Sequence, residues 1–175
     1  MSVLPLYVEP HPVLRTKARP VETFTEDLQR LTQDLIETMY ANDGIGMAAP
    51  QVGCDLQVFV ANPSQALGQE LVVVNPVLEV ARGQARIVEG CLSLPHIWER
   101  VRRSARVRLQ GRDAFGKHLL LEADGLLAIV LQHEFDHLQG RLFIDRLSWI
   151  RRRLLSRRAQ PAPVTVRMKS LHGCV

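Results

Sequence analysis

The segment from Asp124 to Gly140 constrains the fold more than any other part of the chain. It predicts a helix that starts near Asp124, a candidate cap, and stops before Gly140, a typical C-terminal glycine. Its residues are apolar nearly all round, so the helix must be buried among other elements. Two histidines, His133 and His137, lie four residues apart in it and therefore share one face. The sequence predicts a buried helix that presents two imidazoles side by side.

The sequence His133-Glu134-Phe135-Asp136-His137 matches the pattern H-E-x-x-H, in which two imidazoles bind one metal ion. Glu134 is then placed to act on a water molecule held by that metal. The structural alternative is a pair of core histidines at this spacing by chance. In an apolar helix, however, two buried imidazoles without a metal would each need a polar partner, so the pattern favours a metal site.

A catalytic metal takes three protein ligands, and the third ligand separates the known classes of site. One metalloprotease pattern would require a histidine where this chain has Phe143, and another requires a later glutamate, which does not occur after Glu134. Other candidates for the third ligand are Asp145, the remaining histidines and the three cysteines, which are Cys54, Cys91 and Cys174. Cys91 is the best placed, and the alternative for it is a small buried apolar residue.

The rest of the chain predicts a single α+β domain. An amphipathic helix is expected over 25–42, a glycine-rich loop over 44–53, and a third helix over 148–159. Short β-like runs, with turns at Asn75-Pro76 and Phe115-Gly116 among others, predict antiparallel strands packed around the buried central helix, with a basic helix at the C-terminal end. The runs are 56–61, 71–74, 77–80, 85–88, 105–110 and 118–122. No membrane span or secretory signal is predicted, so a cytoplasmic protein is expected.

Three separated motifs resemble those of the peptide deformylases, the bacterial-type, iron- or zinc-dependent polypeptide deformylase family. The motifs are Gly44-Ile45-Gly46-Met47-Ala48-Ala49-Pro50-Gln51, Glu89-Gly90-Cys91-Leu92-Ser93 and Gln132-His133-Glu134-Phe135-Asp136-His137. They occur in the family's order and at its approximate spacings. The one departure inside a motif is Met47, where the family usually has a leucine of similar volume.

The resemblance implies a hydrolase that removes the N-formyl group from the formylmethionine of newly made proteins and releases formate. The implied metal ligands are Cys91, His133 and His137, around one divalent ion that is Fe2+ in the cell, although Zn2+, Ni2+ or Co2+ suit the same ligands. The family's metal-bound water attacks the formyl carbon with Glu134 as general base and acid. The other implied catalytic residues are Gln51, Leu92, through its backbone N–H, and Gly46.

The resemblance also implies a substrate site with an apolar pocket for the methionine side chain. The implied pocket residues are Ile45, Ile87, Leu126, Ile129 and Val130, for each of which plain core packing is the alternative. Gly46 and Gly90 would lie beside the substrate backbone. Glu89 is also expected in the substrate site. Together with Arg103, it matches a pair of residues that in the family braces the segment around the metal-binding cysteine. The sequence assigns no definite role to His96 or Trp98. For Trp98 the alternatives are that it lines the outer substrate cleft or that it caps a hydrophobic patch.

Charge is distributed unevenly along the chain. All 18 acidic residues lie before Ser148, whereas 148–175 carries seven basic residues and no acid. We therefore distinguish a catalytic domain over 1–147 from a basic C-terminal helix and tail over 148–175, which extends the same domain. That segment resembles a deformylase segment that docks on the ribosome, and the alternative for it is a solvated helix face that aids solubility. A monomer is expected. The alternatives to an active deformylase are a metallopeptidase, a ribosome- or RNA-binding protein with a structural metal, and a catalytically silent deformylase relative.

Overall fold

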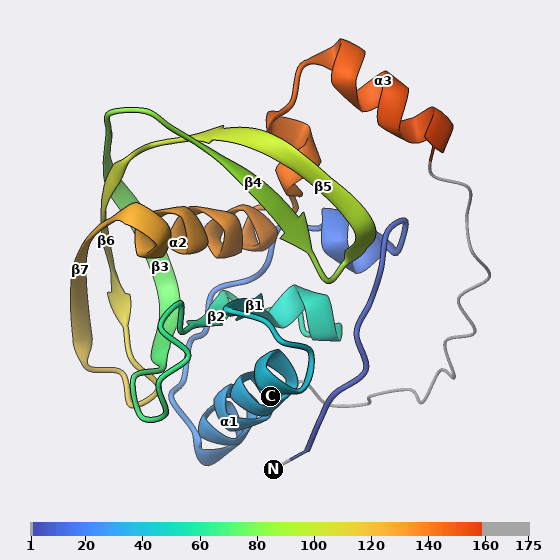
Figure 1. The fold of residues 1–175 in the computed structure, drawn as a ribbon. Coiled ribbons are helices and arrows are strands. Elements are labelled where there is room, and N and C mark those ends of the chain that lie inside the picture. Colours follow the sequence, from blue (N-terminus) through green and yellow to red (C-terminus); the bar gives the residue numbers. More distant parts are fainter. Residues whose placement is uncertain (1, 159–175) are drawn as a thin grey trace.

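The computed structural model describes residues 2–158, and Figure 1 shows how their helices and strands are arranged. Three α-helices, seven strands and three short 3-10 helices make up this part of the chain. In chain order they are η1 Pro12–Arg15, α1 Glu26–Ala41, β1 Gly46–Ala48, η2 Ala49–Val52, β2 Val58–Ala61, β3 Leu71–Arg82, β4 Ala85–Cys91, β5 Leu94–Arg103, β6 Arg106–Arg112, β7 His118–Asp124, α2 Gly125–Leu138, η3 Phe143–Arg146 and α3 Trp149–Arg158.

The strands form two sheets in which all neighbours are antiparallel. One sheet has five strands in the order β1-β2-β3-β6-β7, and the other consists of β4 and β5. Figure 1 shows α2 between them, with β4 and β5 over one side of the helix and the five-stranded sheet curving around the other. The predicted α+β class with antiparallel strands is confirmed.

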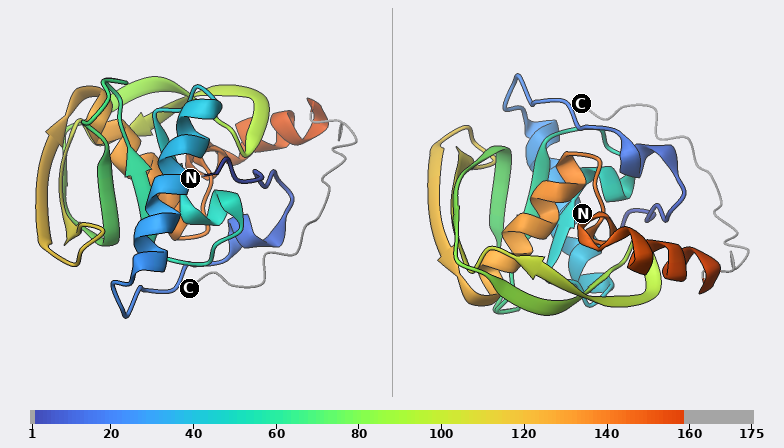
Figure 2. Two further views of the ribbon diagram at one scale, coloured as in Figure 1. Left: turned by 90° about the horizontal axis from the view of Figure 1, so that it is seen from below. Right: turned by 90° about the horizontal axis from the view of Figure 1, so that it is seen from above.

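The strands β1 and β2 are covered on both faces, by α1 on one side and α2 on the other (Figures 1 and 2). Alternate residues of β2 serve the two cores, because Phe59 packs into the cluster around α2 and Val60 into the cluster around α1. Helix α1 begins after Thr25, whose side-chain oxygen accepts a hydrogen bond from the Leu28 N–H. The sequence placed α1 correctly to within a residue at each end.

Helix α2 is buried along most of its length, as its apolar composition predicts. Asp124 occupies the N-cap position, but its side chain makes no capping hydrogen bond, so the expected cap is wrong in that respect. Gly140 lies just past the helix with φ of 68°, a left-handed conformation that suits glycine. A Cβ there would lie 2.6 Å from the Arg15 carbonyl oxygen, so close approach of η1 also requires glycine at this position.

The predicted turn at Asn75-Pro76 is wrong, because β3 runs through it as one long strand with irregular pairing there. Asn75 takes a left-handed φ of 50°. Its side-chain amide replaces the missing ladder bonds, since it accepts from the Val21 N–H and donates to the Val21 carbonyl, each at 2.8 Å. A bulge of this kind absorbs a proline without ending the strand.

The sequence missed two strands. The first, β1, lies inside the expected glycine-rich loop, and the second, β5, pairs with β4. Part of the expected third helix is present as α3, whereas Pro161, Pro163 and Cys174 lie outside the described residues. Among the helices that the structure describes, none is long and apolar enough to cross a membrane.

Candidate metal centre

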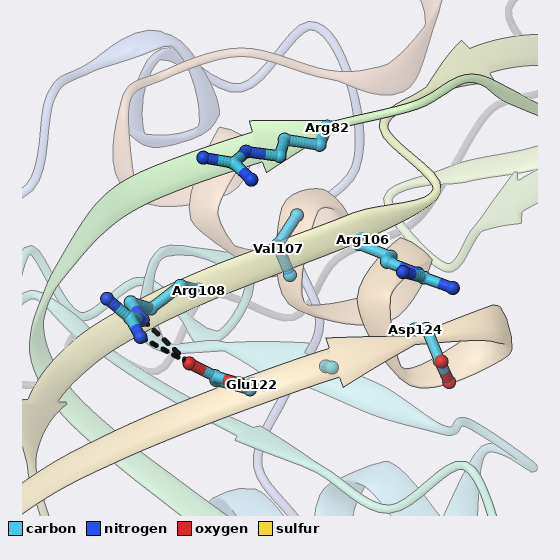
Figure 3. Close-up of a pocket in the computed structure, with 7 residues that line it drawn as sticks. Arg82, Arg106, Val107, Arg108, Glu122 and Asp124 are labelled. Atoms are coloured by element: carbon cyan, nitrogen blue, oxygen red, sulfur yellow. Dashed lines mark hydrogen bonds and ion pairs between the residues drawn. The ribbon is translucent and has the colours of Figure 1, made fainter.

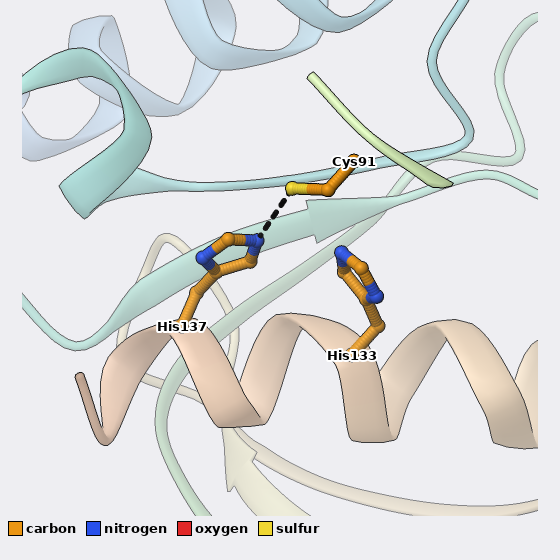
Figure 4. A group of neighbouring side chains, drawn as sticks. All are labelled: Cys91, His133 and His137. Atoms are coloured by element: carbon orange, nitrogen blue, oxygen red, sulfur yellow. Dashed lines mark hydrogen bonds between the residues drawn. The ribbon is translucent and has the colours of Figure 1, made fainter. Parts of the chain in front are cut away.

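Three side chains from two elements converge on one point. Cys91 ends β4, and His133 and His137 project from α2. One ligand atom from each lies within 4.8 Å of the others, and the Cys91 Sγ is 3.2 Å from the His137 Nε2 (Figure 4). The fold thus brings together residues that are far apart in the chain.

Glu89 orients the first histidine. Its Oε2 lies 2.8 Å from the His133 Nδ1, so a proton on Nδ1 is bound to the carboxylate and the other ring nitrogen is left for the cluster. Burial alone raises the pKa of Glu89, but hydrogen bonds from Arg103 and His133 outweigh it and bring that pKa down to about 2. The carboxylate is therefore ionised and accepts both bonds.

A buried ionic network stands behind Glu89. Arg103 donates to both Glu89 oxygens, at 2.7 and 2.9 Å, and to the Asp136 Oδ2 at 2.5 Å. These three side chains are each at most 6% exposed. Arg146 also bonds Asp136, through its Nε at 3.0 Å and through its Nη2. The network joins β4, β5, α2 and η3 around the ligand cluster.

The imidazoles and the thiol match the donors that a metal ion requires. Burial holds the pKa of His137 well below its usual value, which keeps that ring neutral. For His133, burial lowers the pKa, but hydrogen bonds with Cys91 and Glu89 outweigh burial and raise it well above the usual value. A metal bound at His133 would displace that proton. A thiolate with two neutral imidazoles is a donor set for Zn, Fe, Co or Ni, so the cluster fits such an ion.

Glu134 lies beside this cluster with no partner of its own. It is 3% exposed, and its Oε2 makes no hydrogen bond to any described residue. The His137 Nδ1 is also buried without a partner among the described residues. Burial raises the pKa of Glu134 to about 7. A buried carboxylate without a partner is costly, so its position indicates a group that binds a ligand, water or a proton in function.

Gln51 lies in η2 and is buried. Its Oε1 accepts from the Ala48 N–H at 2.9 Å, which fixes the amide. Its Nε2 donates to the Ser93 Oγ at 3.3 Å and lies 3.7 Å from the Cys91 Sγ. The Gln51 amide nitrogen therefore points toward the ligand cluster.

A cavity of about 500 Å³ opens beside the cluster, and nearly all the site residues expected from the sequence line it. The expected residues that line it are Ile45, Gly46, Gln51, Ile87, Glu89, Gly90, Cys91, Leu92, Leu126, Ile129, Val130, His133 and Glu134. His137 lies behind them in the ligand cluster. His96 and Trp98, to which the sequence assigned no definite role, also line the cavity.

Two features of the site were not expected from the sequence. Asp136 is the centre of the ionic network, and the signal that could have found it is an acidic residue in the last turn of a buried helix. Phe143, which occupies the third-ligand position of one protease pattern, packs against His133 instead, with ring centroids 6.1 Å apart.

Comparisons with known proteins agree with this geometry. The family model described as polypeptide deformylase matches residues 3–153. A peptide deformylase of Acinetobacter baumannii (strain SDF) is 43% identical over 153 residues, 87% of each chain. One from Alkalilimnicola ehrlichii is 42% identical over 161 residues, which is 91% of this chain and 90% of the relative.

Solved structures extend the likeness to three dimensions. The crystal structure of a peptide deformylase from Legionella pneumophila has a TM-score of 0.85 and 40% identity, and that from Thermus thermophilus has 0.84 and 42%. Each comparison covers 89% of this chain and 92% of the other. On its family match, its sequence identity and its structure, the chain belongs to the polypeptide deformylase family.

Proposed function

We propose that the protein hydrolyses the N-formyl group from the formylmethionine of newly made proteins and releases formate. Family membership supports the reaction. The observation that carries it for this chain is a buried, unpartnered Glu134 carboxylate beside a Cys91, His133 and His137 cluster at a substrate-sized cavity. A structural metal site would need neither that carboxylate nor that cavity.

We propose that Cys91, His133 and His137 bind the metal ion and that this ion is Fe2+ in the cell. Bound there, it supplies Lewis acidity that makes water a nucleophile near neutral pH. The support for iron is the soft thiolate with two imidazoles, a set that also accepts Zn2+, Ni2+ or Co2+. Metal analysis after anaerobic purification tests this, with activity that declines in air expected for Fe2+. Full activity that survives air, with zinc bound, would contradict it.

Glu134 carries the protons. Its carboxylate accepts one from the attacking water and returns it to the departing amine, and one positioned group serves both steps. Burial holds its pKa near neutrality, where a carboxylate exchanges protons readily. The Gln51 amide, held by Ala48, and the Leu92 backbone N–H donate to the oxygen that gains charge at the formyl carbon.

The cavity selects the substrate. Ile129 and Val130, each 5% exposed, form its floor on α2 together with the more exposed Leu126, and Ile45 and Ile87 face them from the loop and from β4. An apolar pocket of this kind accepts the unbranched thioether of methionine. Gly46 and Gly90 line the cavity and would lie beside the substrate backbone. A Cβ at Gly46 would lie 2.4 Å from the Glu134 Oε1, and one at Gly90 would lie 2.6 Å from the Trp98 ring, so both positions require glycine.

Formate release from a formyl-Met-Ala-Ser peptide tests the reaction. The protein is prepared anaerobically with Fe2+ or Ni2+ and compared with Glu134→Ala at equal metal content, with the unformylated peptide as a control for peptide cleavage. Metal-dependent formate that falls by a factor of about 10² to 10⁴ in the variant is expected. No formate from a protein holding one metal equivalent, or equal rates from both proteins, would overturn the assignment.

We further propose that residues 1–147 act as the catalytic domain of a cytoplasmic monomer and that the basic segment 148–175 docks on the ribosome. The described part of that segment supports it, since Arg151, Arg152 and Arg153 are exposed on α3. Removal of the residues after Leu147 should reduce ribosome association at low salt and leave turnover of the small peptide nearly unchanged. Unchanged association would refute the docking role, and sedimentation at a dimer's mass would refute the monomer.

A further inference from the structure

The chain forms one long antiparallel ribbon that bends at a corner. On one side of the corner β3 pairs with β6, with Arg82 opposite Arg106. On the other side β4 pairs with β5 in the continuing register, with Arg86 opposite Arg102. Figure 1 shows the two pairs of strands joined at this bend. Gly83, with φ of 68°, lies in the corner next to Ala105.

One face of this ribbon is rich in arginine. Exposed residues alternate with buried or half-buried ones over 85–89, 98–103 and 106–110, and most of the exposed positions carry an arginine, although Val88 and Trp98 are exposed as well. We call the exposed positions of 82–90 and 98–106 the arginine face; the arginines in it are Arg82, Arg86, Arg100, Arg102 and Arg106. No acidic residue occupies the same alternate positions of these two segments.

Within the part of the chain that the structure describes, these five guanidinium groups make no ion pair and no hydrogen bond. Other surface arginines do find acidic partners: Arg19 bonds Asp55 at 2.8 Å, and Arg108, next along β6, bonds Glu122 at 2.5 Å. The arginine face is therefore an exception on a surface where ion pairs are common.

This arrangement is unfavourable in the isolated chain. Arg82 and Arg106 are directly opposite each other across the strands, and so are Arg86 and Arg102. Like charges in opposite positions of an antiparallel pair destabilise it. An anion bound between the members of each pair would reverse the sign of that interaction.

A concavity of about 470 Å³ lies at one end of the arginine face. Arg82 and Arg106 line it, and Figure 3 shows them on neighbouring strands. Two acidic residues also line it. Glu122 already forms an ion pair with Arg108, and Asp124, although opposite Arg106 in register, makes no ion pair with it among the described residues. The hollow has room for a group that projects from a partner, such as a phosphate.

We propose that the arginine face binds the phosphodiester backbone of RNA. All five cations are arginines, whose planar guanidinium groups bind phosphate through paired N–H donors. Paired strands hold them in a fixed array, which matches the regular phosphates of an RNA helix better than a flexible acidic peptide. The ribbon also bends between the two cross-strand pairs, whereas a flat bilayer favours cations that share one plane.

The arginine face is distinct from the basic helix α3, although the two are neighbours. Arg151 on α3 is 3.4 Å from Glu99, which lies on β5 next to Arg100. RNA bound to the ribbon would therefore pass close to α3. The test leaves α3 and the tail unchanged, so that any loss is due to the ribbon.

The experiment compares the full-length protein with two variants of equal net charge. The first replaces both cross-strand pairs, Arg82→Gln, Arg86→Gln, Arg102→Gln and Arg106→Gln. The matched control replaces four exposed basic residues elsewhere, Lys17→Gln, Arg30→Gln, Lys117→Gln and Arg141→Gln. Binding of a fluorescent RNA duplex of about 20 base pairs is followed by anisotropy across a salt series. Circular dichroism melting shows that each variant is folded, so the test does not depend on deformylase activity.

Wild-type binding should weaken steeply with salt. In the ribbon variant we expect the slope of log K against log salt to fall by about 3 to 4, close to one for each phosphate that is no longer neutralised. The control variant should change that slope by less than about one. Equal changes in both variants, an unchanged ribbon variant, or stronger binding of polyglutamate or of vesicles with phosphatidylserine than of RNA would each overturn the proposal.

Discussion

Replacement of Gly46 by alanine should impair the reaction through Glu134. A Cβ at position 46 would lie 2.4 Å from the Glu134 Oε1 and 2.8 Å from the Val130 Cγ1. Ordinary contacts of a Cβ begin near 3.4 Å, so the carboxylate must retreat by about 1 Å. Gly46 does not have a left-handed backbone conformation, so the added methyl group is the only perturbation.

A displacement of about 1 Å at a reacting group costs on the order of 100-fold in rate. We therefore expect kcat for formate release to fall by about that factor in Gly46→Ala, with a stability loss of about 1 to 3 kcal/mol from crowding against Val130. Steady-state kinetics on the formylated peptide, beside urea unfolding, measure the two effects. Gly44→Ala is the matched control, because its Cβ would meet Met39 at 3.1 and 3.3 Å and would not meet Glu134.

A double-mutant cycle with Glu134→Asp isolates the cause. The shorter side chain withdraws the carboxylate from position 46, so the alanine should cost less than about tenfold in that background. The reasoning is refuted if the alanine costs the same in both backgrounds. It is also refuted if only KM rises, since the methyl group would then obstruct substrate and leave Glu134 in place.

Three further predictions concern the charged groups of the site. Arg103→Met should lower the free energy of unfolding in urea by about 3 to 5 kcal/mol, because the buried Glu89 and Asp136 carboxylates lose their shared guanidinium partner. Arg146→Gln, at a side chain that is 42% exposed, should cost less than about 1 kcal/mol. Similar losses in the two variants would contradict the importance of the buried pair. The pKa of Glu89 is depressed from 4.5 to about 2, so Glu89 contributes stability above pH 4.5 that is lost as the pH falls toward 2, on the order of 3 kcal/mol in total. In Glu89→Gln, the free energy of unfolding should therefore depend less on pH over that range. Glu134 must be ionised to accept a proton, so kcat/KM should fall tenfold per pH unit below the pKa of Glu134. Burial raises that pKa to about 7, and a cation at the cluster lowers it. A pH–rate profile without an acidic limb down to pH 4 would contradict the role of Glu134 as base.

Local signals explain what the sequence predicted well. Helix α1 has its capping threonine and its apolar period within the segment itself, and α2 begins with a run of apolar residues and is followed by Gly140. The two metal-binding histidines were within reach, because imidazoles four residues apart on a helix have a specific chemistry. The other site residues were expected only from the resemblance to the deformylases. Residues of all three motifs line the cavity or form the ligand cluster.

The errors lie where distant residues decide the local structure. Asn75-Pro76 predicts a turn, but hydrogen bonds with Val21 and with the Gln57 carbonyl, from other parts of the chain, hold Asn75 within β3. The sequence of β5 carries charges at its exposed positions, and it becomes a strand because β4 is available to pair with it. The role of Asp136 depends likewise on Arg103 and Arg146, which approach it only in the folded chain.

The ligand cluster joins the two-stranded sheet to α2, beside the buried ionic network of Glu89, Arg103 and Asp136. Cys91 belongs to the two-stranded sheet, and the two histidines belong to α2, so an ion bound by all three cross-links the hairpin of β4 and β5 to the centre of the domain. Binding to the folded chain alone adds about 2.7 kcal/mol of stability when the free metal is 100 times its dissociation constant. Metal supply therefore controls the resistance of this chain to unfolding and proteolysis, in addition to the rate at which it hydrolyses its substrate.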